Sequence, residues 1–197
     1  PTGKQDYRRY QYGGSFGGPI KKDKIHFFGA YERTQQDTKQ IVDTLGLFPS
    51  ENGIFDTPYR ENLLTTKVTA NLNSAHYLSV RYGRNQNSQP YGADPRTPVN
   101  GWGTSENKFN SANLNHNWVV GGSALNEDII QYADFDNAIS ANSKDPTQTF
   151  PNGVSIGQNG NTPQATQQKK WQFRDDFSWH VSGMGGLGHD FKAGVNF

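Results

Sequence analysis

The residues with the most chemical potential lie close together in the stretch WQFRDDFSWHV, residues 171–181. Asp175, Asp176 and His180 suggest an acid–base site, because a carboxylate and a histidine can together move protons in catalysis. In an extended chain, however, Asp176 and His180 share a face and lie about 13 Å apart, given the rise per residue of a strand. Their side chains do not touch at that separation, so a structural role in a polar surrounding is favoured over catalysis.

The other residue types that bind metals or act as nucleophiles show no useful spacing. The five histidines are scattered, without an HExxH or HxH pattern, and the chain has no cysteine. Thiolate metal sites, disulfides and cysteine nucleophiles are therefore excluded. No spacing predicts a metal or a cofactor, and we expect the protein not to be an enzyme.

A glycine-rich run, GGSFGGPIKKDK, leads into a cluster of lysines at residues 13–24. A phosphate-binding loop would need GxGxxG, or a GK[ST] ending, followed by a helix. The glycines here have neither spacing and an aromatic stretch follows, so we interpret the run as part of a hairpin. Nucleic-acid binding is not expected either, because 19 basic residues are balanced by 18 acidic ones.

The composition excludes a membrane-spanning helix but allows a membrane barrel. Hydrophobic residues make up 32% of the chain and aromatic residues 13%. No window approaches the roughly eighteen apolar residues that a spanning helix needs. A strand that crosses a bilayer needs only every second residue to be apolar, over about ten residues.

Apolar and polar residues alternate along most of the chain, as in strands whose two faces meet different surroundings. In LTTKVTANLN, residues 64–73, Leu64, Val68 and Leu72 fall on one face and Lys67 on the other. The alternation predicts about eight strands in an antiparallel up-and-down meander. Their approximate ranges are 7–20, 25–42, 62–73, 76–88, 108–120, 125–138, 169–182 and 189–197.

Three residues break the alternation. His116 interrupts the apolar row of its strand, and Asp175 lies on the apolar side of another. Phe135 is out of phase with the apolar residues before it, which a β-bulge or an early strand end would explain.

The connections between the expected strands alternate between short and long. Short connections fall at residues 21–24, 73–76, 121–124 and 183–188, and long ones at about 43–61, 89–107 and 139–168. An up-and-down sheet places every second connection at the same end, so the long loops gather at one end. This asymmetry is typical of outer-membrane barrels, and we interpret the all-β chain as the wall of a transmembrane β-barrel.

The stretch GGSFGGPIKKDKIHFFGAYE, residues 13–32, resembles the first barrel hairpin of TonB-dependent receptors of the Oar-like type. Three further pieces resemble successive strand pairs of that barrel in the same order: LLTTKVTANLNSAHYLSVRYGRNQ, ALNEDIIQYADFDNAIS and WQFRDDFSWHVSGMGGLGHDFKAGVNF. The resemblance covers most of the chain; it is specific in the first hairpin and looser in the loops.

The resemblance implies a barrel of about 22 strands that encloses an N-terminal plug domain. Residues 1–197 would be a partial outer-membrane β-barrel domain, a fragment from the N-terminal part of the wall without the plug. The implied function is energy-coupled uptake of a bulky, scarce ligand into the periplasm of a Gram-negative cell. The implied partners are outer-membrane lipid, a ligand such as a siderophore, sugar or peptide, and the TonB complex, acting through the missing plug region.

Polar residues of the wall are candidates for contact with the ligand or the plug. We expect five to face the lumen: Arg81, Arg84, Arg174, Asp176 and Lys192. The alternative is that these five only hydrogen-bond one another and water in a wide lumen. In the long loops, Tyr91 and Trp102 are candidates for stacking against a ligand such as a sugar.

Two other hypotheses belong to different classes of protein. A secreted β-sandwich that binds carbohydrate or protein would seal its apolar faces across one dry core. An enzyme on a small barrel would need a compact acid–base cluster, which the sequence does not show. We also expect that a barrel excerpt is not stable alone unless it closes or associates, because open sheet edges are not tolerated in lipid.

Overall fold

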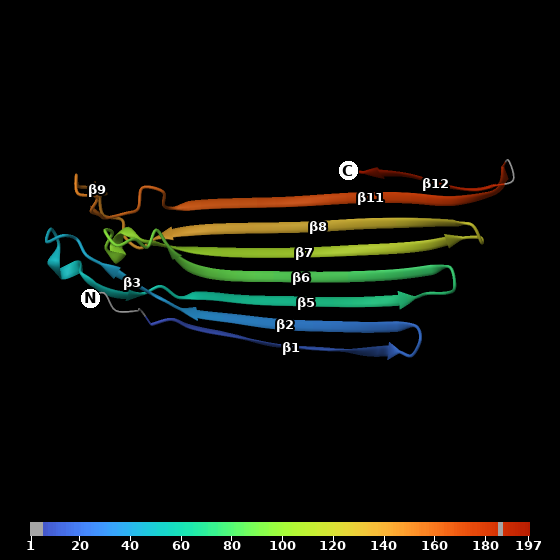
Figure 1. The fold of residues 1–197 in the computed structure, drawn as a ribbon, viewed down its shortest axis with the longest axis horizontal. Coiled ribbons are helices and arrows are strands. Elements are labelled where there is room, and N and C mark those ends of the chain that lie inside the picture. Colours follow the sequence, from blue (N-terminus) through green and yellow to red (C-terminus); the bar gives the residue numbers. More distant parts are fainter. Residues whose placement is uncertain (1–5, 185–186) are drawn as a thin grey trace.

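The computed structural model describes residues 6–184 and 187–197, and its main feature is one antiparallel sheet of eight strands (Figure 1). The strands are β1 (Arg8–Lys21), β2 (Ile25–Asp37), β5 (Tyr59–Asn71), β6 (His76–Tyr91), β7 (Gly103–Val120), β8 (Ala124–Ala141), β11 (Gln164–Met184) and β12 (Leu187–Asn196). They lie side by side in chain order. The predicted all-β, up-and-down meander of eight strands is confirmed.

The long connections contain short elements of their own. Between β2 and β5, the strands β3 (Lys39–Val42) and β4 (Gly53–Asp56) form a hairpin around the 3-10 turn η1 (Pro49–Glu51). The 3-10 turn η2 (Val99–Gly101) precedes β7, and β9 (Gln148–Thr149) pairs with β10 (Ser155–Ile156) before β11. A single strand over residues 25–42 was therefore wrong: β3 leaves the main sheet and pairs with β4 instead.

The connections are sorted by length between the two ends of the sheet. Figure 1 shows the tight turns at one end and all three long connections at the other. Residues 185–186, inside the expected turn at 183–188, lie outside the described residues. In the part of the chain that the structure describes, no helix has the length and apolar character needed to cross a membrane.

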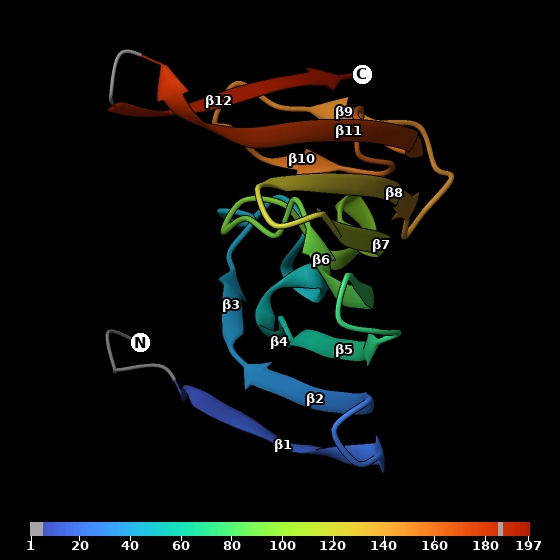
Figure 2. The same cartoon turned by 90° about the vertical axis from the view of Figure 1, so that its right-hand side faces the viewer.

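The eight strands form an arc with a concave and a convex side (Figure 2). The connection between β6 and β7 and the strand β3 lie on the concave side of this arc (Figure 2). The two ends of the arc are β1 and β12, because no pairing joins them in the described residues. The sheet is therefore an open wall with two free edges, as expected of part of a larger barrel.

Directly paired residues share a face, so the register shows which side chains lie together. On one face, Val68 of β5 lies between Phe27 of β2 and Val80 of β6. On the other, Thr34, Ser105 and Ile139 are buried near the long connections, which fold over the concave side (Figure 2). The apolar face is therefore convex and the polar face concave.

The apolar rows of the convex face are not sealed against another layer. Leu64 is 36% exposed, Val68 42% and Leu72 57%. Within the described residues, no second sheet packs on this face, since the other two sheets are the two-stranded pairs β3–β4 and β9–β10. The sandwich hypothesis therefore fails, and the face needs an apolar surrounding such as lipid.

A chain of polar side chains interrupts the convex face between two apolar zones. His116 Nδ1 lies 3.1 Å from Asp128 Oδ2, and His116 Nε2 lies 3.0 Å from His76 Nδ1. Asp175 of β11 is directly opposite Asp128, and its Oδ1 atom is buried without a hydrogen-bond partner. On β11 this carboxylate lies midway between Trp171 and Trp179, in the middle of the apolar span.

Phe135 is out of phase with the apolar residues before it, but a β-bulge is not the reason. β8 pairs with both β7 and β11 without a register shift, and Phe135 lies directly opposite Phe109. Both rings belong to the concave face, since the register places them beside Asn85 and Gln168. The rings of Phe109 and Phe135 therefore lie side by side on the polar face, near its loop end.

The first hairpin depends on glycines where strands approach closely. A Cβ atom on Gly13 would lie 2.3 Å from the Tyr31 carbonyl oxygen, which is rigid backbone. The Phe16 ring covers Gly29, whose added Cβ would lie 3.2 Å from the ring edge. This is the expected role of the glycines: they allow close approach, and aromatic rings cover the bare backbone.

We predict that Gly13→Ala lowers the free energy of unfolding of the protein in detergent by about 1–3 kcal/mol, because the new methyl group overlaps the neighbouring strand. Gly14→Ala is the matched control, since no atom lies within 4 Å of its added Cβ. Urea unfolding followed by tryptophan fluorescence measures both. Equal stability of the two variants would contradict the observed register of β1 and β2.

We also predict that Asp175→Leu raises the free energy of unfolding in lipid by about 1–2 kcal/mol, because it removes a carboxylate from the lipid-facing side. Asp176→Leu, one residue away on the concave face, should lower it, because that carboxylate forms ion pairs with Arg174 and Lys192. Unfolding in lipid vesicles gives both values. A loss of stability in Asp175→Leu would show that lipid does not cover this part of the wall.

Candidate functional site

The concave face carries a ladder of side-chain amides close to the long connections. The side chain of Asn137 donates to Asn107 (2.8 Å), Asn107 to Asn87 (2.9 Å), Asn87 to Asn85 (3.1 Å), and Asn85 to Glu61 (2.9 Å). This chain of donors crosses from β8 to β5 and ends on a carboxylate. It ties four strands together beyond their backbone bonds and presents a neutral, hydrogen-bonding surface.

Three of the five predicted lumen residues lie together nearer the short turns. Asp176 of β11 forms ion pairs with Arg174 and, at 3.4 Å, with Lys192 of β12. Lys192 also lies 3.6 Å from Glu127 of β8. Each charge in this cluster has a partner of opposite sign. The cluster therefore braces β8, β11 and β12 against one another.

Arg84 does not face the lumen, so that prediction was wrong. Its backbone is paired directly opposite Leu64, and it therefore belongs to the convex face. Its guanidinium lies 3.4 Å from the Gln86 Oε1 atom on the same face. The prediction followed the polarity of the side chain, whereas the period of two places Arg84 in phase with the apolar Tyr82. An arginine beside the apolar zone extends its charge toward water.

Arg81 shares the concave face with Lys67, which lies directly opposite it across β5 and β6. The alternation in the sequence places Lys67 on the polar face, but its position opposite Arg81 was not predicted. A signal was available, because residues equally far from a short hairpin turn lie opposite each other.

The three long connections pack against one another as a loop cap, which comprises residues 38–58, 92–102 and 142–163. The Asp43 N–H donates to the Pro95 carbonyl (2.8 Å), which joins the first connection to the second. The Ser155 N–H donates to the Arg96 carbonyl (3.3 Å), which joins the third to the second.

Each of the three connections buries at least one apolar side chain in the loop cap. Val42 is 2% exposed, Trp102 2% and Val154 0%. The rings of Phe48 and Phe150 also meet edge to face, with centroids 5.6 Å apart. The long connections are therefore a folded unit rather than independent loops.

Trp102 is one of these buried side chains, which leaves no open ring face for a ligand to stack on. Its indole N–H donates to the Thr97 carbonyl (2.7 Å), and its ring meets Phe55 edge to face at 6.1 Å. Tyr91 lies at the end of β6, half-buried and in phase with the concave face. A ligand-stacking role for Tyr91 stays a prediction.

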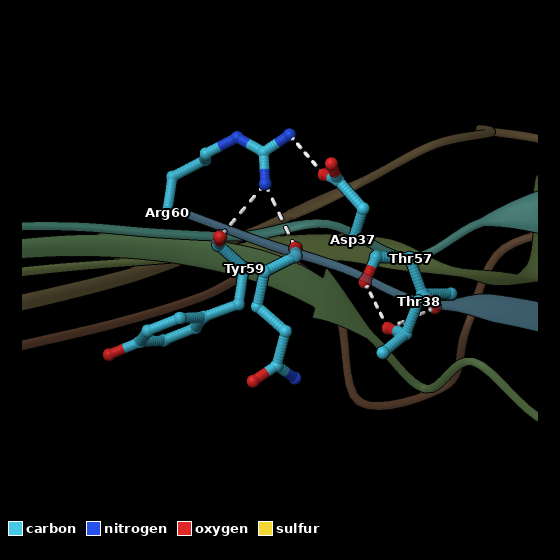
Figure 3. A network of polar contacts seen from close by, with 6 residues as sticks. Asp37, Thr38, Thr57, Tyr59 and Arg60 are labelled. Atoms are coloured by element: carbon cyan, nitrogen blue, oxygen red, sulfur yellow. Dashed lines mark hydrogen bonds and ion pairs between the residues drawn. The ribbon is translucent and has the colours of Figure 1, made fainter. Parts of the chain in front are cut away.

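A polar network connects the loop cap to the main sheet at the point where β2 ends and β5 begins (Figure 3). Arg60 donates from Nη1 to the carbonyls of Gln36 and Tyr59, both at 2.9 Å, and from Nη2 to Asp37 at 2.5 Å. The Thr38 hydroxyl donates to the Thr57 carbonyl at 2.7 Å. One guanidinium thus supplies donors to carbonyls at the end of the β2–β5 ladder.

The residues that first suggested catalysis are held apart. His180 Nδ1 lies 2.7 Å from Asp190 Oδ1 of β12, while Asp176 contacts Arg174 and Lys192 instead. No group of three or more potential metal ligands gathers in the described part of the chain.

Comparisons with known proteins agree with this geometry. Residues 1–57 match a family model described as an outer membrane beta barrel domain. The fold is similar to that of the outer membrane transporter YddB from Escherichia coli, with a TM-score of 0.76 and 13% sequence identity. The match covers 97% of this chain and 25% of that one, so the chain spans about a quarter of the transporter's length. No curated protein matches the sequence.

The family match and the fold together support the outer-membrane location that the sequence predicts. The structural likeness concerns the arrangement of strands, because sequence identity is low. The sheet is accordingly interpreted as part of an outer-membrane β-barrel wall that resembles the barrel of a transporter.

We predict that Trp102→Ala unfolds the loop cap and leaves the main sheet folded. Removing a buried tryptophan side chain lowers the free energy of unfolding by about 3–5 kcal/mol. Limited proteolysis should then cut within residues 92–102, while strand content measured by circular dichroism is retained. Tyr91→Ala, at the end of β6, serves as the control and should leave the cap resistant. An unchanged cleavage pattern in Trp102→Ala would show that the ring does not hold the cap together.

Proposed function

We propose that the chain forms part of the wall of a TonB-dependent outer-membrane receptor that takes up a bulky, scarce ligand. The observation that carries the proposal is the two-faced wall. Its convex side exposes apolar rows, its concave side carries paired charges and amides, and a folded cap lies over the concave side at one end (Figure 2). Such a wall separates lipid from a wet interior.

The open arc favours a wide lumen and therefore a large ligand. Eight strands closed on themselves would leave room only for their own side chains or for one small ligand. Here β1 and β12 are the unpaired edges of the described sheet, so closure needs further strands. A wider barrel with a plugged lumen suits energy-coupled uptake better than free diffusion.

The proposal is tested by uptake in cells that make the complete protein, with and without a functional TonB. A labelled ferric siderophore, a maltodextrin and a peptide are the probes. We expect at least one to accumulate in a TonB-dependent manner and to stop accumulating when TonB is deleted. Accumulation that is independent of TonB, or no accumulation of any probe, would reject the proposal.

A cysteine-labelling control shows whether the protein has reached its place in the membrane. The chain has no cysteine of its own, so Lys144→Cys in the loop cap and Gly122→Cys in a short turn each introduce a single cysteine into residues 1–197. In intact cells a membrane-impermeant maleimide should label the first variant only. Uptake results are read only from cells that pass this control.

A further inference from the structure

The pair Lys67 and Arg81 places two positive charges side by side on the concave face. Lys67 of β5 is directly opposite Arg81 of β6, and both side chains are exposed. Like charges in directly opposite positions destabilise a sheet. Neither residue forms an ion pair with a carboxylate of the described residues, unlike Arg174 and Lys192.

The surrounding wall offers these charges no partner. Three successive rows of the concave face, followed from β2 to β11, contain no Asp or Glu. The rows are Ala30, Thr65, Gly83, Ser111, Ala133, Lys170; then Phe28, Lys67, Arg81, Asn113, Gln131, Gln172; then His26, Thr69, Ser79, Asn115, Ile129, Arg174. Lys170, in the first of these rows, adds a further positive charge, whereas Arg174 is already paired with Asp176.

The acidic residues that flank this zone on the same face already have partners. Toward the loop cap, Glu32 accepts from Gln11 (2.8 Å) and Glu61 from Asn85 (2.9 Å). Toward the short turns, Glu127 lies 3.6 Å from the Lys192 amine. The neighbouring carboxylates thus have partners of their own, and Lys67 and Arg81 have no carboxylate partner among the described residues.

The cation pair lines a hollow whose other polar side chains carry hydroxyl and amide groups, which can donate hydrogen bonds as well as accept them. Lys67 and Arg81 are joined there by Ser79, Ser111, Asn113, Asn115 and Gln131. Hydroxyl and amide groups beside a guanidinium suit the oxygen atoms of a carboxylate or a phosphate, because arginine binds such groups through two parallel N–H bonds. The lysine adds a point charge at the same place.

We propose that Lys67 and Arg81 form a binding site for an oxyanion, a carboxylate or phosphate group, on the lumen wall. The proposal rests on the proposed function only in that the concave side is the lumen. Two sources have the required chemistry. The anion belongs either to a ligand passing through the lumen or to a carboxylate of another part of the same protein that fills it.

Titration of inorganic phosphate into the complete protein in non-ionic detergent tests the site, with chloride keeping the ionic strength constant. If the anion is a free ligand, phosphate should bind saturably and raise the melting temperature. Lys67→Gln and Arg81→Gln should each weaken this binding by about tenfold or more, the factor expected for a lost charged hydrogen bond. Lys22→Gln, a lysine in a short turn, is the control and should bind phosphate as before.

If a carboxylate of the protein itself occupies the site, phosphate should not bind to the unaltered protein. Lys67→Gln and Arg81→Gln should then lower the melting temperature, and Lys22→Gln should not. The inference is overturned if phosphate binds equally to all variants, or if it binds to none and the two substitutions leave the melting temperature unchanged or raise it. The titration needs neither TonB nor a transported ligand, so its failure and a failure of the uptake experiment are separate results.

Discussion

A sheet that stands in a membrane has to pair its backbone groups internally while its two faces meet different surroundings. The eight strands do this by pairing each strand with the next one of the sheet along the chain, so that β1 and β12 are the free edges of the sheet in the described residues. The alternation of side chains then assigns every residue to lipid or to the interior. The remaining features of the structure follow from this division.

Charged side chains have different partners on the two faces of the sheet. On the concave face the charges are either paired, as Asp176 is with Lys192, or without a carboxylate partner among the described residues, as at Lys67 and Arg81. On the convex face an unpaired charge is costly, and some of the polar residues there contact one another. His116 lies between Asp128 and His76 in this way, whereas Asp175 is left with an unsatisfied oxygen atom.

Neither face of the sheet can build a dry core, since one meets lipid and the other a wet interior. The tightly buried side chains therefore gather in the loop cap, around Val42, Trp102 and Val154. Burial there holds together three connections that are far apart in the sequence. The cap, which folds on its own buried side chains, covers the concave side at one end of the sheet.

The alternation of polar and apolar residues in the sequence was sufficient to predict the meander, the two faces and the end at which the long loops gather, because the period of a strand is a local property. The alternation was also sufficient to predict which face four charged residues share: Arg81, Arg174, Asp176 and Lys192 all lie on the concave face. Arg84 was misplaced because polarity was given more weight than phase, although the phase was present in the sequence.

The tertiary structure decided what depends on contacts between distant segments. The sequence placed Trp102 in a long loop, but only the packing of three loops shows that its ring is buried. Likewise, the absence of a carboxylate near Lys67 and Arg81 emerges only when rows from six strands are aligned. Local alternation determines which face a side chain takes, whereas its neighbours on that face are set by the register and by loops that close over many residues.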